Sequence, residues 1–167
     1  MTNNLKLYTV LTYILIPIAL FFGFLDVLFL LSALANPSAL IFVFVIACLV
    51  IYTFASFKFY RLGMQREQIL TKSLKDWVKV NAFVSLFLCS LFCLNAFSVL
   101  GSSNATLLQY IDDYILQQPG FPKEITGNLV LKMLKAVSVL FLITGAVGLI
   151  HIRITLRLVK QYDYLFE

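Results

Sequence analysis

Asp26 is the residue whose position most strongly suggests chemistry. It is the only acidic residue inside the long apolar runs of this chain, and it interrupts the run from Leu7 to Leu34. An ionisable side chain within a membrane-spanning segment is costly, so it marks a functional site or requires a partner. Lys132 and Lys135 enter the last apolar run at a similar depth, so the first interpretation is a structural ion pair between Asp26 and one of them. The alternative is a binding site for a proton or another cation.

Three cysteines also lie inside apolar runs. Cys89 and Cys93 are four residues apart, which places them roughly 6 Å from each other on one helix face. Such a pair could serve an intramembrane redox reaction, but a reactive thiol needs partial exposure and a stabilised thiolate, which hydrocarbon opposes. Buried cysteine otherwise behaves as a small hydrophobic residue. We therefore expect Cys48, Cys89 and Cys93 to be packing residues.

His151 is the single histidine and lies beside Arg153 near the end of the last apolar run. One histidine without Cys, Asp or Glu at ligand spacing does not make a metal site. Its titration could gate an activity with pH, but we expect a side chain that extends to the membrane interface. The sequence has no Gly-rich phosphate loop and no G-x-S-x-G or H-E-x-x-H motif. We predict that the protein is not an enzyme and has no catalytic, cofactor-binding or metal-binding residues.

Four apolar runs must position these side chains, at about residues 7–34, 39–57, 80–100 and 133–152. A helix needs roughly 20 apolar residues to cross a hydrocarbon core of about 30 Å. Only helices and closed barrels satisfy their backbone in lipid, and nothing here alternates like a barrel strand. The first run is far longer than the roughly 7–15 apolar residues of a cleavable signal peptide. The predicted fold is an all-α, four-transmembrane-helix bundle that forms a single integral membrane domain over residues 1–167.

Composition leads to the same class of protein. Hydrophobic residues make up 61% of the 167 residues and charged residues 13%. Soluble domains carry about 45–50% and about 25%, respectively. The excess of apolar residues excludes a soluble enzyme or a soluble binding module. The net charge of +5 does not imply nucleic acid as a partner, because the positions of the basic residues explain it.

Basic residues are concentrated in the loop 58–79, the tail after the last run and the N-terminus. They are Lys58, Arg61, Arg66, Lys72, Lys75, Lys79, Arg153, Arg157, Lys160 and Lys6. The outer segment 101–132 instead holds Asp112, Asp113 and Glu124 against Lys123 before its end. Positive residues favour the cytoplasmic side of a membrane. The pattern predicts cytoplasmic N- and C-termini in the plasma (inner) membrane, with the basic loop near anionic inner-leaflet lipids.

Small and polar residues form stripes on three of the predicted helices at 100° per residue. The stripes are Thr12, Ala19, Gly23, Asp26 and Ala33; Asn81, Ala82, Ser85, Cys89, Cys93 and Ala96; and Ser138, Gly145 and Gly148. Small residues let transmembrane helices approach closely, and polar residues form hydrogen bonds between them. We expect these stripes to face the bundle interior and the Phe-rich and Leu-rich faces to contact lipid.

Two amphipathic segments lie outside the apolar runs. Leu70, Leu74 and Trp77 recur at helical spacing and predict an interfacial helix that continues into the third span. In the outer segment, Thr106-x-x-Gln109 fits a capping box before an amphipathic arc. Gln117-Gln118-Pro119-Gly120 is expected to end that short helix.

The preferred function is non-enzymatic: a small integral membrane protein that acts as a structural, assembly or regulatory partner of a larger membrane system. The expected partners are the lipid bilayer and either another protein or further copies of the chain. The alternative is a small oligomeric transporter or channel in which Asp26 is the proton or cation site. The candidate intramembrane polar residues are Asp26, Lys132, Lys135, Asn81 and His151. An intramembrane redox protein is a third, weaker hypothesis.

Overall fold

A computed structural model describes residues 2–118, 120, 122 and 125–167 of the chain. Five α-helices form the fold within this part: α1 (Thr2–Ala33), α2 (Leu40–Lys58), α3 (Lys72–Gly101), α4 (Asn104–Leu116) and α5 (Gly127–Gln161). Three short helical segments join or follow them: η1 (Pro37–Ala39), η2 (Phe59–Met64) and η3 (Asp163–Leu165). The all-helical fold is confirmed for the described residues.

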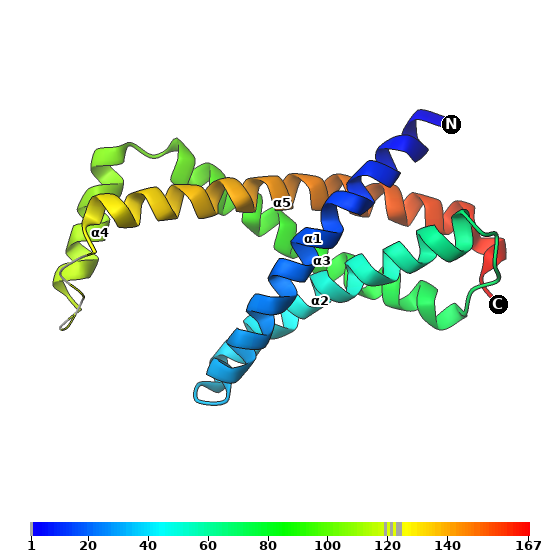
Figure 1. Ribbon diagram of the computed structural model, residues 1–167, viewed down its shortest axis with the longest axis horizontal. Helices are drawn as coiled ribbons and strands as arrows, with labels where there is room; N and C mark the ends of the chain where they lie inside the picture. Colours follow the sequence, from blue (N-terminus) through cyan, green and yellow to red (C-terminus); the bar gives the residue numbers. More distant parts are fainter. Residues whose placement is uncertain (1, 119, 121, 123–124) are drawn as a thin grey trace.

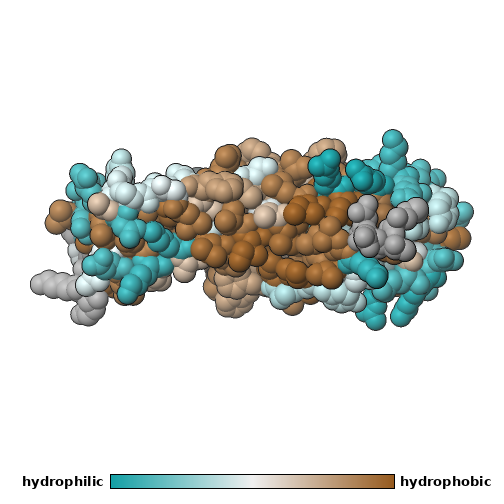
Figure 2. Space-filling view, turned by 90° about the horizontal axis from the view of Figure 1, so that it is seen from above, coloured by the Kyte–Doolittle hydropathy of each residue, from teal (hydrophilic) through white to brown (hydrophobic). Residues whose placement is uncertain are grey.

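Four segments are long and apolar enough to cross a membrane: Leu5–Ala33, Pro37–Met64, Lys72–Gly101 and Gly127–Gln161. They match the four predicted runs but extend beyond them, because charged residues continue the same helices past the apolar part. Figure 2 shows the result on one face of the molecule, where apolar side chains form a belt between two polar ends. This is the arrangement expected of a multi-pass membrane protein.

The helices pack closely at one end and diverge at the other (Figure 1). The end of α1, η1 and the start of α2 form one projection, here called the α1–α2 arm (residues 21–46). The end of α3, α4 and the start of α5 form the other, here called the α3–α5 arm (residues 91–140). The loop between α2 and α3 and the C-terminus lie together at the opposite end. The sequence predicted a four-helix bundle, and the divergence of its helices into the two arms is a feature that the prediction did not contain.

The α3–α5 pair forms the tightest helix contact, and its small residues explain why. A Cβ built on Gly145 would lie 2.6 Å from Cys93 Sγ, and one on Gly148 would lie 2.5 Å from Cys89 Sγ. Ser138 is buried on the same stripe of α5. Helices can approach this closely only where small residues meet. The predicted inward position of the stripes on α3 and α5 is confirmed, and the three cysteines are free thiols.

The C-terminal segment closes the basic end of the molecule. Leu70 and Phe166 form an isolated parallel bridge, in which Leu70 N donates to the Leu165 carbonyl at 2.7 Å and Glu167 N to the Leu70 carbonyl at 2.9 Å. Lys75 Nζ contacts Asp163 Oδ1 at 2.5 Å. The predicted interfacial helix is therefore wrong at its start: Leu70 precedes the helix, because its backbone pairs with the C-terminal segment. The helical state of its remainder is confirmed, since α3 begins at Lys72 and runs unbroken into the span, whereas its position at the membrane interface stays a prediction.

The short helix of the predicted outer segment exists as α4, but its cap differs from the prediction. Ser103 is the N-cap, and its Oγ accepts a hydrogen bond from Thr106 N at 3.1 Å. Thr106 is thus the third residue of the helix, because the Ser-x-x-Thr segment offers an earlier hydroxyl to the free amides. Ile111 is buried against α5, whereas Tyr110 and Tyr114 are exposed. Pro119, Lys123 and Glu124, used in the sequence argument, lie outside the described residues.

Candidate functional site

A polar cluster centred on His151 lies inside the bundle, in the part where the helices pack closely. This part is here called the closed end. The imidazole is fully buried, with 0% exposure, where α1 and α2 pack beside α5. Its Nε2 lies 3.0 Å from Thr12 Oγ1 on α1, and its Nδ1 lies 2.8 Å from the Tyr52 hydroxyl on α2. The Tyr8 ring stacks on the imidazole at 4.8 Å between centroids. One side chain of α5 thus links three of the four spanning helices.

Counting protons in this cluster fixes the direction of the hydrogen bond between His151 and Thr12. The Thr12 hydroxyl donates its only proton to the Tyr8 carbonyl at 2.7 Å. Thr12 Oγ1 must therefore accept the bond from His151, so Nε2 carries a proton. The Tyr52 hydroxyl donates to Thr155 Oγ1 at 2.8 Å, and the Tyr52 oxygen also lies 2.8 Å from Nδ1. The cluster is satisfied internally, as expected of a polar group that holds helices together in lipid.

The expected interfacial position of His151 is wrong. The sequence places it near the end of the apolar run, but α5 continues to Gln161 and α1 packs over the ring. The spacing of the partners was a usable signal that sequence reasoning missed. Tyr8 and Thr12, and likewise His151 and Thr155, are four residues apart and so share a helix face.

Asp26 lies on the predicted small face of α1 but has no hydrogen-bond or ion-pair partner in the part of the chain that the structure describes. Thr12, Ala19 and Ala33 of that face are buried, whereas Asp26 is only half-buried. Three buried side-chain oxygens in the described residues lack a hydrogen-bond partner, and Asp26 Oδ1 is the one that belongs to an ionisable group. One turn earlier, a Cβ built on Gly23 would contact Val50 at 3.7 Å, so this part of the face packs on α2.

The expected pair between Asp26 and a lysine of α5 does not form. Lys135 Nζ instead donates a hydrogen bond to Asn104 Oδ1 at the start of α4, and Lys132 is exposed. Within the described residues the one ion pair joins Lys75 and Asp163. The physical reason is the divergence of the helices, because Asp26 belongs to the α1–α2 arm and both lysines belong to the α3–α5 arm (Figure 1).

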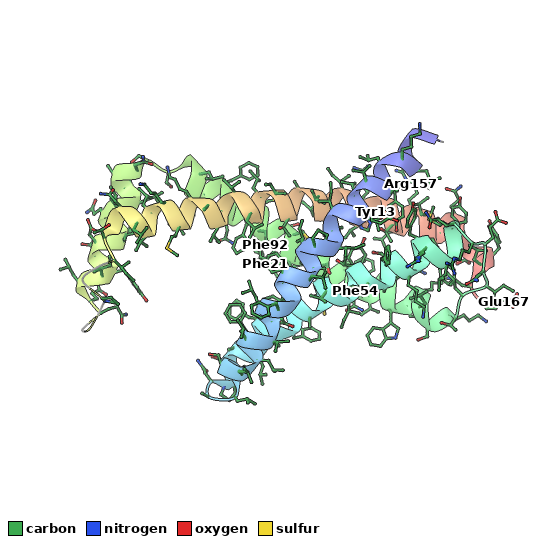
Figure 3. All side chains as sticks on the ribbon, viewed as in Figure 1. Tyr13, Phe21, Phe54, Phe92, Arg157 and Glu167 are labelled. Atoms are coloured by element: carbon green, nitrogen blue, oxygen red, sulfur yellow. The ribbon has the colours of Figure 1, made fainter. Side chains whose placement is uncertain are left out.

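An apolar cavity of about 580 Å³ lies where the two arms separate. Phe22 of α1, Phe92 of α3 and Phe141 of α5 stack at its base, with centroids 5.5 Å apart for the first two rings and 4.4 Å for the last two. Phe21 and Phe92, labelled in Figure 3, mark this junction and both line the cavity. Asn95 lines it as well, but Asp26 does not. The cavity therefore offers an apolar space without the acidic group that an ion pathway through it would use.

Asn81 is the last predicted candidate. Its side chain is 6% exposed, and its Nδ2 donates to the Trp77 carbonyl at 2.8 Å, so it packs inward as expected. No group of three or more His, Cys, Asp or Glu side chains in the described part of the chain could hold a metal ion.

The fold and these sites together define the class of protein as a small multi-pass helical membrane protein. Its helices pack around the His151 cluster at the closed end and separate around an apolar cavity at the other. Comparison with known proteins finds no matching protein family, no similar curated protein and no similar solved structure.

Proposed function

We propose that the chain is a small non-enzymatic protein of the plasma (inner) membrane that acts as a structural, assembly or regulatory partner of a larger membrane system. The observation that carries this proposal is the half-buried Asp26 carboxyl group on an exposed apolar arm, whose Oδ1 has no hydrogen-bond partner among the described residues. Buried polar groups in lipid are normally paired with one another or with backbone carbonyls. A polar side chain of a second polypeptide would supply the missing partner.

The surface around Asp26 supports this proposal. Only 17% of the residues in the most apolar part of α1 are buried within the chain. Phe29 and Leu30, three and four residues after Asp26 and so on its side of α1, are both exposed. An apolar helix face that contains one acidic residue suits docking to another transmembrane helix, because the partner gains contact area and a hydrogen bond.

The orientation of the chain is part of the proposal. The basic loop between α2 and α3 lies at the same end as the C-terminus, and α4 with Asp112 and Asp113 lies at the end opposite (Figure 1). By the positive-inside rule the basic end is cytoplasmic, near anionic lipids, and α4 is external.

An oligomeric transporter remains the alternative, and the same carboxyl group favours it. An unpaired Asp26 is free to bind a proton or cation. Because Asp26 does not line the cavity between the four helices, a pathway through it would have to form between copies of the chain. Cation flux into vesicles that contain only the purified chain, lost in Asp26→Asn, would support this alternative.

The test compares the size of the native assembly for three proteins extracted in mild detergent. The wild-type chain should migrate in a complex larger than one copy. Asp26→Leu should release a folded single chain, because its docking group is gone while removal of a costly polar group leaves the fold intact. Asn95→Leu is the matched control, since Asn95 is also a polar residue within a span but already donates to the Leu91 carbonyl. A wild-type chain that migrates alone, or an unchanged complex in Asp26→Leu, would refute the proposal.

A further inference from the structure

A groove of about 450 Å³ runs between α2 and α3, apart from the cavity between the arms. One wall is a single face of α3 from Ser73 to Val84, and the other is α2 from Phe44 to Ile51. Ser73 and Val84 are eleven positions apart along α3. At a rise of 1.5 Å per residue, the groove is about 16 Å long. This is close to the depth of one hydrocarbon leaflet, about half of 30 Å. The dimensions suit one acyl chain.

The groove is polar at one end and apolar at the other. Ser73 and Asp76 lie at the end beside the basic loop, followed by Trp77, which is 53% exposed. Phe44 and Val84 lie at the far end. Exposed tryptophan is typical of the head-group level of a membrane. The groove therefore has the polarity of a membrane lipid, with the head group beside Asp76 and the chain beside Val84.

The charges at the polar end select the head group. Asp76 is exposed and makes no ion pair within the described residues, whereas its neighbour Lys75 is bound to Asp163. Lys72 and Lys79, one turn before and after Asp76, are exposed on the same side of α3. A phosphate group beside Lys79, on the side of the acyl chain, leaves Asp76 facing the next group of the lipid, and a carboxylate there favours an ammonium group over a neutral alcohol.

Asn81 adds a second polar contact inside the groove. It is nearly buried, and its Nδ2 is used by the Trp77 carbonyl. Its Oδ1 has no hydrogen-bond partner among the residues that the structure describes. This oxygen can therefore accept a hydrogen bond from a bound molecule.

We propose that the α2–α3 groove binds a phospholipid with a phosphoethanolamine head group, whose ammonium contacts Asp76, whose phosphate lies beside Lys79, and whose acyl chain follows α3 toward Val84. This site does not depend on the docking of the α1–α2 arm, so either proposal can fail alone.

Native mass spectrometry of the full chain tests the site with two lipids that share the same acyl chains. Phosphoethanolamine lipid should be retained about twofold to fivefold more than phosphoglycerol lipid, the range expected of one exposed ionic contact. Asp76→Asn should abolish this preference, and Asp112→Asn on α4 should keep it. Ala47→Trp should fill the groove and reduce retention of both lipids, whereas Ala136→Trp on the exposed side of α5 should not.

Two results would overturn the proposal. The first is equal retention of the two lipids, or a preference for phosphoglycerol lipid, by the wild-type chain. The second is a preference that survives Asp76→Asn. Because Asp76 is exposed and Asp76→Asn keeps the shape of the side chain, this variant decides the matter even if Ala47→Trp fails to fold.

Discussion

His151 contacts α1 and α2 through its two ring nitrogens, so its replacement tests whether the polar cluster holds the closed end together. His151→Leu removes the bonds to Thr12 and Tyr52, and we expect a loss of about 1–3 kcal/mol in the free energy of unfolding. Unfolding in mixed micelles with increasing denaturing detergent measures this loss. Tyr13→Phe, on an exposed position of α1, is the control and should be neutral. A His151→Leu protein as stable as the wild type would contradict the role of the cluster.

For single residues, the sequence predicted the helix face on which a side chain lies. It predicted less well which groups that side chain contacts. The helical period alone placed Asp26 on the small face of α1 and Asn81 on the inner face of α3, and both positions are correct. It could not place His151, because the bond to Thr12 joins residues 139 positions apart and depends on where α1 crosses α5. The pairing of Asp26 with a lysine failed for the same reason.

Two glycines of α5 separate side-chain crowding from backbone crowding at the contact of α3 with α5. Gly148→Ala places a methyl group against Cys89 Sγ, whereas Gly145→Ala places one against both Cys93 Sγ and the Cys89 carbonyl oxygen, at 2.7 Å from the oxygen. Each substitution should lower the free energy of unfolding by about 1–3 kcal/mol, which is the usual cost of overpacking a core. Cys89→Ala should rescue Gly148→Ala, whereas Cys93→Ala should not rescue Gly145→Ala, because the contact with the Cys89 carbonyl oxygen remains. Gly101→Ala is the control, because nothing lies within 4 Å of the added methyl group. Equal rescue of both variants would contradict this packing.

The contact between Lys75 and Asp163 makes the C-terminal segment sensitive to acid. The hydrogen bond from Lys75 holds the pKa of Asp163 below its ordinary value of 3.8. A lowered pKa in the folded state means that the stabilisation is present above pH 3.8 and is lost as the pH falls through the folded value. Hydrogen exchange at the Glu167 amide should therefore be faster in Asp163→Asn than in the wild type at neutral pH, and the two should converge in acid. Asp113→Asn on α4 should match the wild type throughout. A difference that persists in acid would show that the ion pair is not the cause.

The elements themselves were largely predictable, because long apolar runs leave few alternatives to a spanning helix. Their boundaries were not, since they depend on local capping and on distant partners. Ser103 provides the cap of α4 one turn before the predicted Thr106. Leu70 leaves the predicted helix because it pairs with Phe166 at the other end of the chain.

For the whole molecule, the basic residues predict which end faces the cytoplasm. In a chain without its three native cysteines, single cysteines at Gln68, in the basic loop, and at Gln117, after α4, occupy exposed positions. A maleimide that cannot cross the membrane should label the cysteine at 117 in intact cells and leave the one at 68 unlabelled. Both should react after the membrane is opened. The reverse pattern would show that the orientation is inverted.

The divergence of the two arms is the feature of the whole molecule that the sequence did not reveal. Apolar runs and small stripes predict that helices meet, but they do not fix crossing angles. A stack of Phe22, Phe92 and Phe141 fills the point where the arms separate. Exposed apolar residues on both sides of the α1–α2 arm suit lipid and protein contacts equally, so composition alone does not distinguish these surroundings.

A photo-crosslinking side chain at Val27, next to Asp26 on the exposed surface of α1, tests the proposed docking of the α1–α2 arm most directly. We predict a covalent adduct with one defined polypeptide, whose sequence by mass spectrometry distinguishes another protein from a second copy. The same probe at Leu94, an equally exposed position on α3, should give no such adduct. Asp26→Leu should abolish the adduct at Val27. Adducts with lipid alone at both positions, or a polypeptide adduct unaffected by Asp26→Leu, would contradict the account.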